Sequence, residues 1–242
     1  MAVFEYKEKV GILDIRMENL LSNKGVIRIL EDVACEASQD VGYGINNMNE
    51  TDLTWILLSW KIEILKREKF NELLTIKTWT RESSKMFTYR DFEVYNSNNE
   101  LLIKASTKWA AVSPSQGKLR AITPDILEKY QVENDKKVFP DVEDVKLPVF
   151  DEFDNKEVVT IHRNYIDINN HVNNLYYLDI AYEVLPDDVF ENYELNNIEI
   201  VYKRQMLLND RINCYYKKKE DGVYVVLKSF DDKITHAILK LY

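Results

Sequence analysis

The chain has 242 residues, enough for one large domain or for two domains of about 120 residues. Hydrophobic residues make up 45% of it and charged residues 30%, which supports a buried core and excludes a wholly disordered protein. Lysine and arginine number 32 against 41 acidic residues, and the net charge of −9 excludes a generally basic nucleic-acid binder. No apolar run approaches the roughly 20 residues of a membrane span, so none is expected.

Cysteine content and small motifs exclude several further classes. Cys35 and Cys214 are too few for a disulfide framework, and the chain contains no CxxC pair or Cys/His cluster that would suggest zinc. It also has no phosphate-binding glycine loop and no G-x-S-x-G elbow, so neither a nucleotide nor a serine nucleophile is indicated. We therefore expect no metal and no cofactor. The first ten residues lack signal or transit character, so we expect a soluble, cytoplasmic protein.

In the first half, apolar residues at helical spacing from Ile29 to Val41 predict a helix, and Gly42 follows as its stop. Segments rich in β-branched and aromatic residues then predict four strands. They lie at about 55–67, 71–82, 85–96 and 100–113. Ser97-Asn98-Asn99 predicts the hairpin turn between the last two.

The second half repeats this order. A strand at about 156–163 precedes a helix from about Asn173 to Leu185, which Pro186 ends. Four further strands are predicted at about 196–204, 210–219, 222–230 and 233–241. Each half therefore reads as a strand, a helix and four antiparallel strands, an α+β arrangement in which one helix covers one sheet.

Short sequence matches support a tandem duplication, because they occur in the same order at offsets that increase by one. They pair Ile62-Glu63-Ile64 with Ile198-Glu199-Ile200 at offset 136, Lys66-Arg67-Glu68 with Lys203-Arg204-Gln205 at 137, and Asn71-Glu72 with Asn209-Asp210 at 138. We predict an N-terminal domain over residues 1–123, a linker over 124–154 and a C-terminal domain over 155–242. The linker is acidic and rich in proline, and Pro124 predicts a short helix at its start.

The stretch from Tyr165 to Asn174 carries the candidate chemistry. Asp167, Asn169 and His171 are spaced two residues apart, so in an extended segment they would face the same side. They precede the predicted helix, whose first N–H groups, at Val172, Asn173 and Asn174, are suited to an oxyanion. A histidine or carboxylate beside such donors can activate water, so the pattern favours carbonyl hydrolysis.

Other interpretations compete at this stretch. Asparagine and aspartate before a helix are most often caps. An Asp-x-Asn start is also typical of a calcium loop, but Val172 and Leu178 stand where that loop needs glycine and glutamate, which rejects calcium. His162 and His236 lie in strand-like segments, and we interpret them as structural or surface residues.

Residues 167–177 resemble the DxNxHVNNxxY signature of acyl-acyl-carrier-protein thioesterases. Thr54–Ile64, Ala105–Ala110 and Glu199–Arg204 are similar to other strands of that family, in the same order. The resemblance implies a tandem (double) hotdog, each half an antiparallel sheet wrapped around one central helix. It further implies hydrolysis of fatty acyl-acyl carrier protein, terminating or diverting fatty acid synthesis. Asp167, Asn169 and His171 would be catalytic, and the first hotdog would hold the acyl tail. Without a transit segment, the chain is more similar to bacterial than to plastid members.

One position departs from the plant members, which carry Glu and then Cys after paired basic residues. Here Gln205 and Met206 follow, and neither can serve as a base or a nucleophile. We therefore predict attack by water without an acyl-enzyme. His171 or Asp167 would be the base, a choice that stays open here. Asn169 would orient the water or the carbonyl, Gln205 would position the water, and the amides named above would bind the oxyanion.

The implied partner, acyl carrier protein, is acidic, as is this chain, so docking requires local basic patches. The candidate docking residues are Lys66, Arg67, Lys69, Lys203 and Arg204, with Lys217-Lys218-Lys219 as a further cluster. Each basic cluster is equally well interpreted as a run of solvated charges at the end of a strand, without a role in docking. Hotdog domains usually pair side by side, and the two halves can do so within one chain, so a monomer and a homodimer both stay open. Neither nucleic acid nor a membrane is an expected partner.

Two alternatives remain. One is an acyl-CoA thioesterase of the same fold, because fold alone does not fix function; a hydroxyacyl dehydratase is less favoured because its acid and histidine are arranged differently. The other is a non-catalytic acyl-binding protein, which Gln205 favours and the complete Asp167, Asn169 and His171 set opposes.

Overall fold

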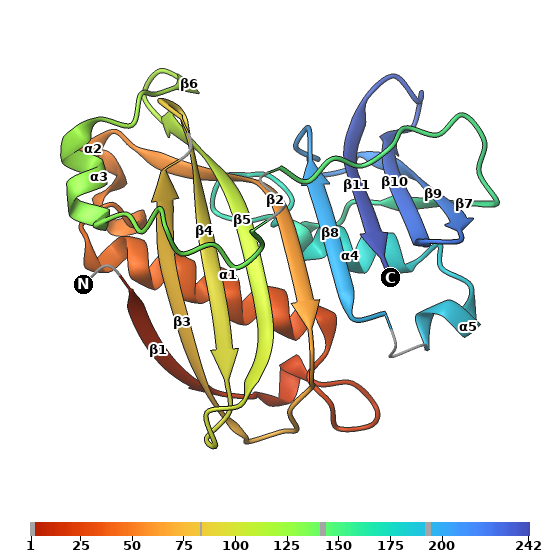
Figure 1. Cartoon of the computed structure of the whole chain (residues 1–242). Coiled ribbons are helices and arrows are strands. Elements are labelled where there is room, and N and C mark those ends of the chain that lie inside the picture. The colour runs from red at the N-terminus through yellow and green to blue at the C-terminus, as the bar shows by residue number, and fades with distance from the viewer. Residues whose placement is uncertain (1–2, 83, 141–143, 192–194) are drawn as a thin grey trace. The chain divides into compact units, whose positions relative to one another are not determined.

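The computed structural model describes residues 3–82, 84–140, 144–191 and 195–242. The chain divides into two compact units, one of residues 1–58 and 62–144 and one of residues 59–61 and 145–242. In each unit a strand and a helix precede four strands that form an antiparallel sheet (Figure 1). This is the predicted tandem hotdog.

The first unit has a five-stranded main sheet in the order β1-β3-β4-β5-β2, with β6 paired to β5. Antiparallel pairing joins β1 to β3, β3 to β4 and β4 to β5. The elements are β1 (Phe4–Lys9), η1 (Ile12–Asp14), α1 (Asn23–Asp40), η2 (Ile45–Asn47), α2 (Met48–Thr51), β2 (Thr54–Ile64), β3 (Leu73–Glu82), β4 (Phe87–Tyr95), β5 (Leu101–Ser113), β6 (Lys118–Leu119) and α3 (Pro124–Tyr130).

The long helix α1 begins six residues before the start of its apolar repeat at Ile29. The Ser22 hydroxyl caps it by accepting a hydrogen bond from the Gly25 N–H at 2.9 Å, which satisfies an otherwise orphaned donor of the first turn. The helix ends as predicted, because Gly42 takes a φ of +81° that glycine adopts without strain.

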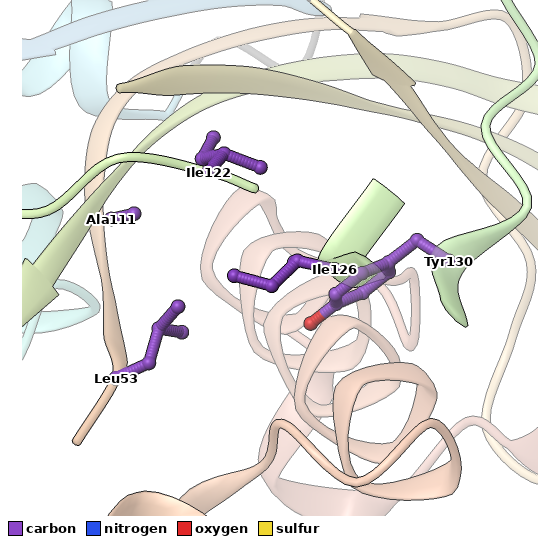
Figure 2. Close-up of a cluster of buried hydrophobic side chains, with 5 residues drawn as sticks. All are labelled: Leu53, Ala111, Ile122, Ile126 and Tyr130. Carbon is purple, nitrogen blue, oxygen red and sulfur yellow. The ribbon is translucent and has the colours of Figure 1, made fainter. Parts of the chain in front are cut away.

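The predicted linker does not form one connecting segment, because the boundary between the two units falls at residues 144 and 145. Its first part is helix α3, which packs onto the first unit through a buried cluster (Figure 2). That cluster consists of Leu53, Ala111, Ile122, Ile126 and Tyr130.

The chain then crosses the face of the first sheet opposite α1 (Figure 1). The Trp79 indole donates to the Lys136 carbonyl at 2.8 Å, and the Val138 N–H donates to the Asp91 carboxylate at 3.0 Å. The Tyr89 hydroxyl donates to the Asp144 carboxylate at 2.7 Å. Residues 124–140 and 144 thus belong to the first unit structurally.

The second unit has a sheet in the order β8-β11-β10-β9-β7 with antiparallel neighbours. Helix α4 packs against β10 and β11. The helix is shorter than predicted because residues 173–175 form a turn in which the Leu175 N–H donates to the Asn173 side chain at 2.9 Å. The elements are β7 (Asn155–Thr160), η3 (Arg163–Tyr165), α4 (Tyr176–Tyr182), α5 (Asp187–Phe190), β8 (Asn197–Tyr202), β9 (Arg211–Lys219), β10 (Gly222–Ser229) and β11 (Thr235–Leu241).

Backbone hydrogen bonds confirm the duplication and fix its register. The loop before α1 and the loop before α4 share several backbone bonds at equivalent residues. The bond from the Arg16 N–H to the Leu20 carbonyl (3.0 Å) corresponds to that from the Asp167 N–H to the His171 carbonyl (2.8 Å). The bond from the Leu21 N–H to the Glu68 carbonyl (2.8 Å) corresponds to that from the Val172 N–H to the Met206 carbonyl (3.0 Å). The bond from the Ser22 N–H to the Asp14 carbonyl (2.7 Å) corresponds to that from the Asn173 N–H to the Tyr165 carbonyl (2.9 Å). Glu68 therefore corresponds to Met206 at offset 138, so the offset of 137 predicted there is wrong by one. Arg67 corresponds to Gln205.

Candidate active site

The motif residues lie on a tight loop between η3 and α4. The Asp167 N–H donates to the His171 carbonyl at 2.8 Å and the Asn170 N–H donates to the Asp167 carbonyl at 3.1 Å. Asn170 takes a φ of 62°, a left-handed conformation that asparagine tolerates better than most residues. The expected extended segment, with alternating side chains, is therefore replaced by a closed turn.

The Asp167 carboxylate holds this turn closed. Its Oδ1 accepts the backbone N–H of Asn169 at 2.8 Å and that of His171 at 3.3 Å. Its Oδ2 faces the Asn169 side-chain amide at 3.4 Å. The aspartate therefore contacts the backbones of both other motif residues, which is a positioning arrangement.

The His171 side chain is half-buried, and Asn169 is exposed. Within the described ranges, the His171 imidazole makes no hydrogen bond to another side chain or to the backbone. Its ring nitrogens are thus available to a ligand or a water molecule, whereas both Asp167 oxygens already have protein donors.

Residues 203–206, which follow β8, lie next to this loop and are hydrogen-bonded to it. The Val172 N–H donates to the Met206 carbonyl at 3.0 Å, so Gln205 precedes a residue that is bonded directly to the motif loop. The Tyr177 hydroxyl lies 3.5 Å from the Arg204 carbonyl and accepts the Met206 N–H at 3.3 Å. Burial raises the pKa of Tyr177 to about 12, so the hydroxyl stays protonated.

A second buried residue shapes the same segment. Nδ1 of His236 lies 3.2 Å from the Arg204 carbonyl and 3.1 Å from the Gln205 carbonyl. Because carbonyl oxygens only accept, Nδ1 must carry the proton. This contact could not be predicted from the sequence, because the position of His236 in a strand does not indicate which distant backbone carbonyls its ring will contact. The contact fixes the backbone of Gln205, whose side chain is exposed.

Two of the three amides predicted for an oxyanion are used within the fold. The Val172 N–H donates to Met206 and the Asn173 N–H donates to Tyr165 at 2.9 Å. An oxyanion at either amide would have to displace a backbone hydrogen bond, which opposes the predicted role of these two amides. At Asn174 the role stays a prediction.

The equivalent loop of the first unit lacks this chemistry. Arg16, Glu18 and Leu20 stand where the second unit has Asp167, Asn169 and His171, so neither the imidazole nor its aspartate has a counterpart. At the position of Gln205, the Arg67 guanidinium donates to the Leu21 carbonyl at 2.7 Å and to the Asn23 side chain at 2.6 Å. The candidate site therefore belongs to the second unit alone.

The predicted docking residues divide by their existing contacts. Arg67 is committed to the bonds just described, and Lys66 pairs with Glu100 at 2.8 Å. Lys69, Lys203 and Arg204 are exposed, and their side chains form no ion pair with a described residue. Lys217, in the third basic cluster, pairs with Asp154 at 2.7 Å.

Burial raises the pKa of Cys214 to about 12, and partial burial together with the nearby Glu31 and Asp32 carboxylates raises the pKa of Cys35 to about 11, so neither thiol is activated. The thiolate is the nucleophilic form. Across the described ranges, no three side chains of the metal-ligating types come together. No helix in those ranges has both the length and the hydrophobicity of a membrane crossing.

Residues 2–130 match the acyl-ACP thioesterase N-terminal domain, and residues 151–238 match the C-terminal domain of the same family. The chain belongs to the acyl-ACP thioesterase family. The family expected from residues 167–177 is thereby confirmed, and in the structure Tyr177, at the end of that stretch, contacts the segment around Gln205.

Plant members of the family are similar over most of this thioesterase-family chain. The chloroplastic oleoyl-acyl carrier protein thioesterase 2 of Arabidopsis thaliana is 23% identical over 227 residues, covering 87% of this chain and 62% of the plant protein. The corresponding enzyme of Coriandrum sativum is 22% identical over 240 residues, covering 92% and 65%. The chain thus spans less than two thirds of the length of these relatives.

Solved structures share the fold of this thioesterase-family chain. An acyl-ACP thioesterase from Bacteroides thetaiotaomicron superposes with a TM-score of 0.87 at 20% identity, covering 99% of this chain and 97% of the other. The 12:0-ACP thioesterase from Umbellularia californica gives a TM-score of 0.85 at 16% identity, covering 100% and 96%.

Proposed function

We propose that this protein hydrolyses the thioester of a fatty acyl-acyl carrier protein to free fatty acid and carrier protein, terminating or diverting fatty acid synthesis. The observation that carries the proposal is the motif loop, where an imidazole with no hydrogen bond to a described residue lies in a turn closed by an aspartate, in a chain of the acyl-ACP thioesterase family. The free thiols of Cys35 and Cys214 fit a reducing compartment such as the cytoplasm.

In the proposed mechanism His171 is the general base. Its ring nitrogens are free to bind water, whereas Asp167 already accepts two backbone donors and faces a side-chain amide. His171 removes a proton from water, and the resulting hydroxide attacks the thioester carbonyl. Collapse of the tetrahedral intermediate breaks the C–S bond, and the imidazolium returns its proton to the departing carrier-protein thiolate. Asp167 positions the loop, and Asn169 and Gln205 orient the water and the carbonyl by hydrogen bonds.

Substrate binding is assigned to two regions. The first hotdog holds the acyl tail, a proposal supported by the buried apolar face of its long helix α1 and by the cluster that α3 completes. The acidic carrier protein docks on exposed cations, for which Lys69, Lys203 and Arg204 are the candidates with no competing ion pair among the described residues. Docking of this kind weakens as salt rises.

The test measures release of free fatty acid from acyl-carrier-protein and acyl-CoA thioesters of several chain lengths. Wild type is compared with His171→Ala and with His162→Ala, a matched control because His162 is an exposed histidine outside the motif. We expect hydrolysis of carrier-protein thioesters that is lost in His171→Ala and retained in His162→Ala. Preference for acyl-CoA would favour the alternative substrate, and acyl binding without hydrolysis would favour a non-catalytic protein.

A further inference from the structure

Among the residues that the structure describes, Arg90 is a buried cation without a carboxylate partner. It lies on β4, is 6% exposed, and has its Nη1 3.3 Å from the Thr78 hydroxyl. That hydroxyl in turn donates to the Asp91 carbonyl at 2.9 Å. Across the described ranges no carboxylate forms an ion pair with Arg90, and its guanidinium makes one side-chain hydrogen bond there, to Thr78.

The same sheet shows how a structural arginine is accommodated. Arg81 is 3% exposed, and its guanidinium makes two hydrogen bonds to Asp91, at 2.8 and 3.2 Å. A buried charge normally requires such compensation. The contrast between Arg81 and Arg90 indicates that the acceptor for Arg90 is supplied from outside the chain.

Further unpaired donors surround Arg90. Its guanidinium lies 5.7 Å from the centre of the Tyr130 ring, which in turn makes an edge contact with Trp55 at 5.8 Å. The Tyr130 hydroxyl and the Trp55 indole nitrogen are both buried without a hydrogen bond of good geometry among the described residues, although the Ser38 and Trp55 side chains lie close enough to the Tyr130 hydroxyl to oppose the rise in its pKa. A guanidinium and an indole can only donate, and a phenol donates readily, so together they are suited to a group that only accepts.

The surroundings define the kind of molecule that would carry this acceptor. Tyr130 belongs to the apolar cluster with Leu53, Ile122 and Ile126, and Figure 2 shows its side chain lying beside Ile126. On α1, Cys35 is close enough to Arg90 for the cation to oppose the rise in its pKa, and burial nevertheless raises that pKa to about 11. Cys35 is itself exposed to solvent.

We propose that Arg90, Tyr130 and Trp55 form a site in the first unit for a carboxylate carried on an aliphatic chain. The aliphatic part of this inference rests on the proposed function. The carboxylate has two possible sources: the free fatty acid product, or an acyl substrate with a second carboxylate at its far end. Both present two acceptor oxygens to the three donors and a hydrocarbon chain to the cluster.

Binding tests the site directly. Titration of the full chain with decanoic acid and with the uncharged 1-decanol, followed by calorimetry, compares wild type with Arg90→Met and Tyr130→Phe. Arg211→Met, an exposed arginine of the second unit, is the matched control. We expect the Kd for decanoic acid to rise by about tenfold or more in Arg90→Met, as for loss of a charged hydrogen bond, and to change little for 1-decanol or in the control.

Thermal unfolding separates a ligand role from a structural one. Unliganded Arg90→Met should melt at or above the wild-type temperature, whereas Arg81→Met should melt well below it. Decanoic acid that binds no tighter than 1-decanol, or equally to wild type and Arg90→Met, would overturn the proposal, as would an Arg90→Met variant destabilised as strongly as Arg81→Met. Failure of Arg90→Met to fold would also overturn the proposal. Tyr130→Phe, which keeps the ring, should also weaken decanoic acid binding.

Hydrolysis identifies the source of the carboxylate. A site for a distal carboxylate predicts faster hydrolysis of decanedioyl- than of decanoyl-carrier protein by wild type, with the preference lost in Arg90→Met. A product site predicts inhibition by decanoic acid that Arg90→Met relieves. Arg90-dependent binding without thioester hydrolysis would refute the proposed function and keep the site. Hydrolysis with Arg90-independent binding would refute only the site.

Discussion

Replacing Asp167 by asparagine or by alanine distinguishes a positioning residue from a general base. The Oδ1 atom of Asp167 accepts the backbone N–H groups of Asn169 at 2.8 Å and His171 at 3.3 Å. An asparagine oxygen can accept both of these bonds but carries no charge, whereas alanine accepts neither. A base function is lost equally in both variants.

The expected magnitudes follow from these two bonds. A hydrogen bond to a charged group contributes about 1.5–3 kcal/mol, and the neutral equivalent about half of that. Asp167→Asn should therefore lose about 1.5–3 kcal/mol from the two bonds together, or roughly 10- to 150-fold in kcat/KM if all of it acts on His171. Asp167→Ala should lose about twice that free energy, so we expect it to be at least about tenfold worse than Asp167→Asn.

The assay is steady-state hydrolysis of one acyl-carrier-protein thioester, with circular dichroism and thermal unfolding to verify that each variant folds. Equal and near-complete losses in Asp167→Asn and Asp167→Ala would refute the reasoning and make Asp167 the base. Wild-type rates in both variants would show that the turn at Asp167 does not position His171.

Three further predictions concern stability and reactivity. Asp91→Asn should lower the free energy of unfolding by about 3–5 kcal/mol, because it removes the charge that pairs with buried Arg81; a urea midpoint close to wild type would contradict this. Tyr177→Phe should cost about 1 kcal/mol and lower kcat, because the hydroxyl links residues 204 and 206; unchanged values of both would exclude that link. Native Cys214 should resist alkylation near neutral pH, because burial raises its pKa to about 12; rapid modification seen by mass spectrometry would show a reactive thiol.

The arrangement of helices and strands could be predicted because each has a local signal. The strands carry period-2 or continuous runs of β-branched and aromatic residues, and Gly42 marks the end of α1. The predicted start of α1 is too late, because its buried apolar face already begins at Val26 and Ile27, one turn after the cap at Ser22. The start of α4 was placed too early because Asn173 closes a turn instead of opening the helix.

The motif could be found in the sequence, but its geometry could not. Spacing alone suggested alternation in an extended segment, whereas the turn depends on the bonds that Asp167 makes to the backbone. The contact from His236 to residues 204 and 205 joins segments about 30 residues apart in sequence, and no local pattern encodes it. The unpaired state of Arg90 likewise follows from which side chains surround it in the folded sheet.

The most direct test of the central claim is the rate of free-fatty-acid release from acyl-carrier-protein thioesters by wild type and His171→Ala. The account predicts hydrolysis by wild type, a fall of about 100-fold or more in His171→Ala as for loss of a general base, and no acyl-enzyme in quenched reactions. Undiminished hydrolysis by His171→Ala, or an acyl group trapped covalently on the protein, would contradict it.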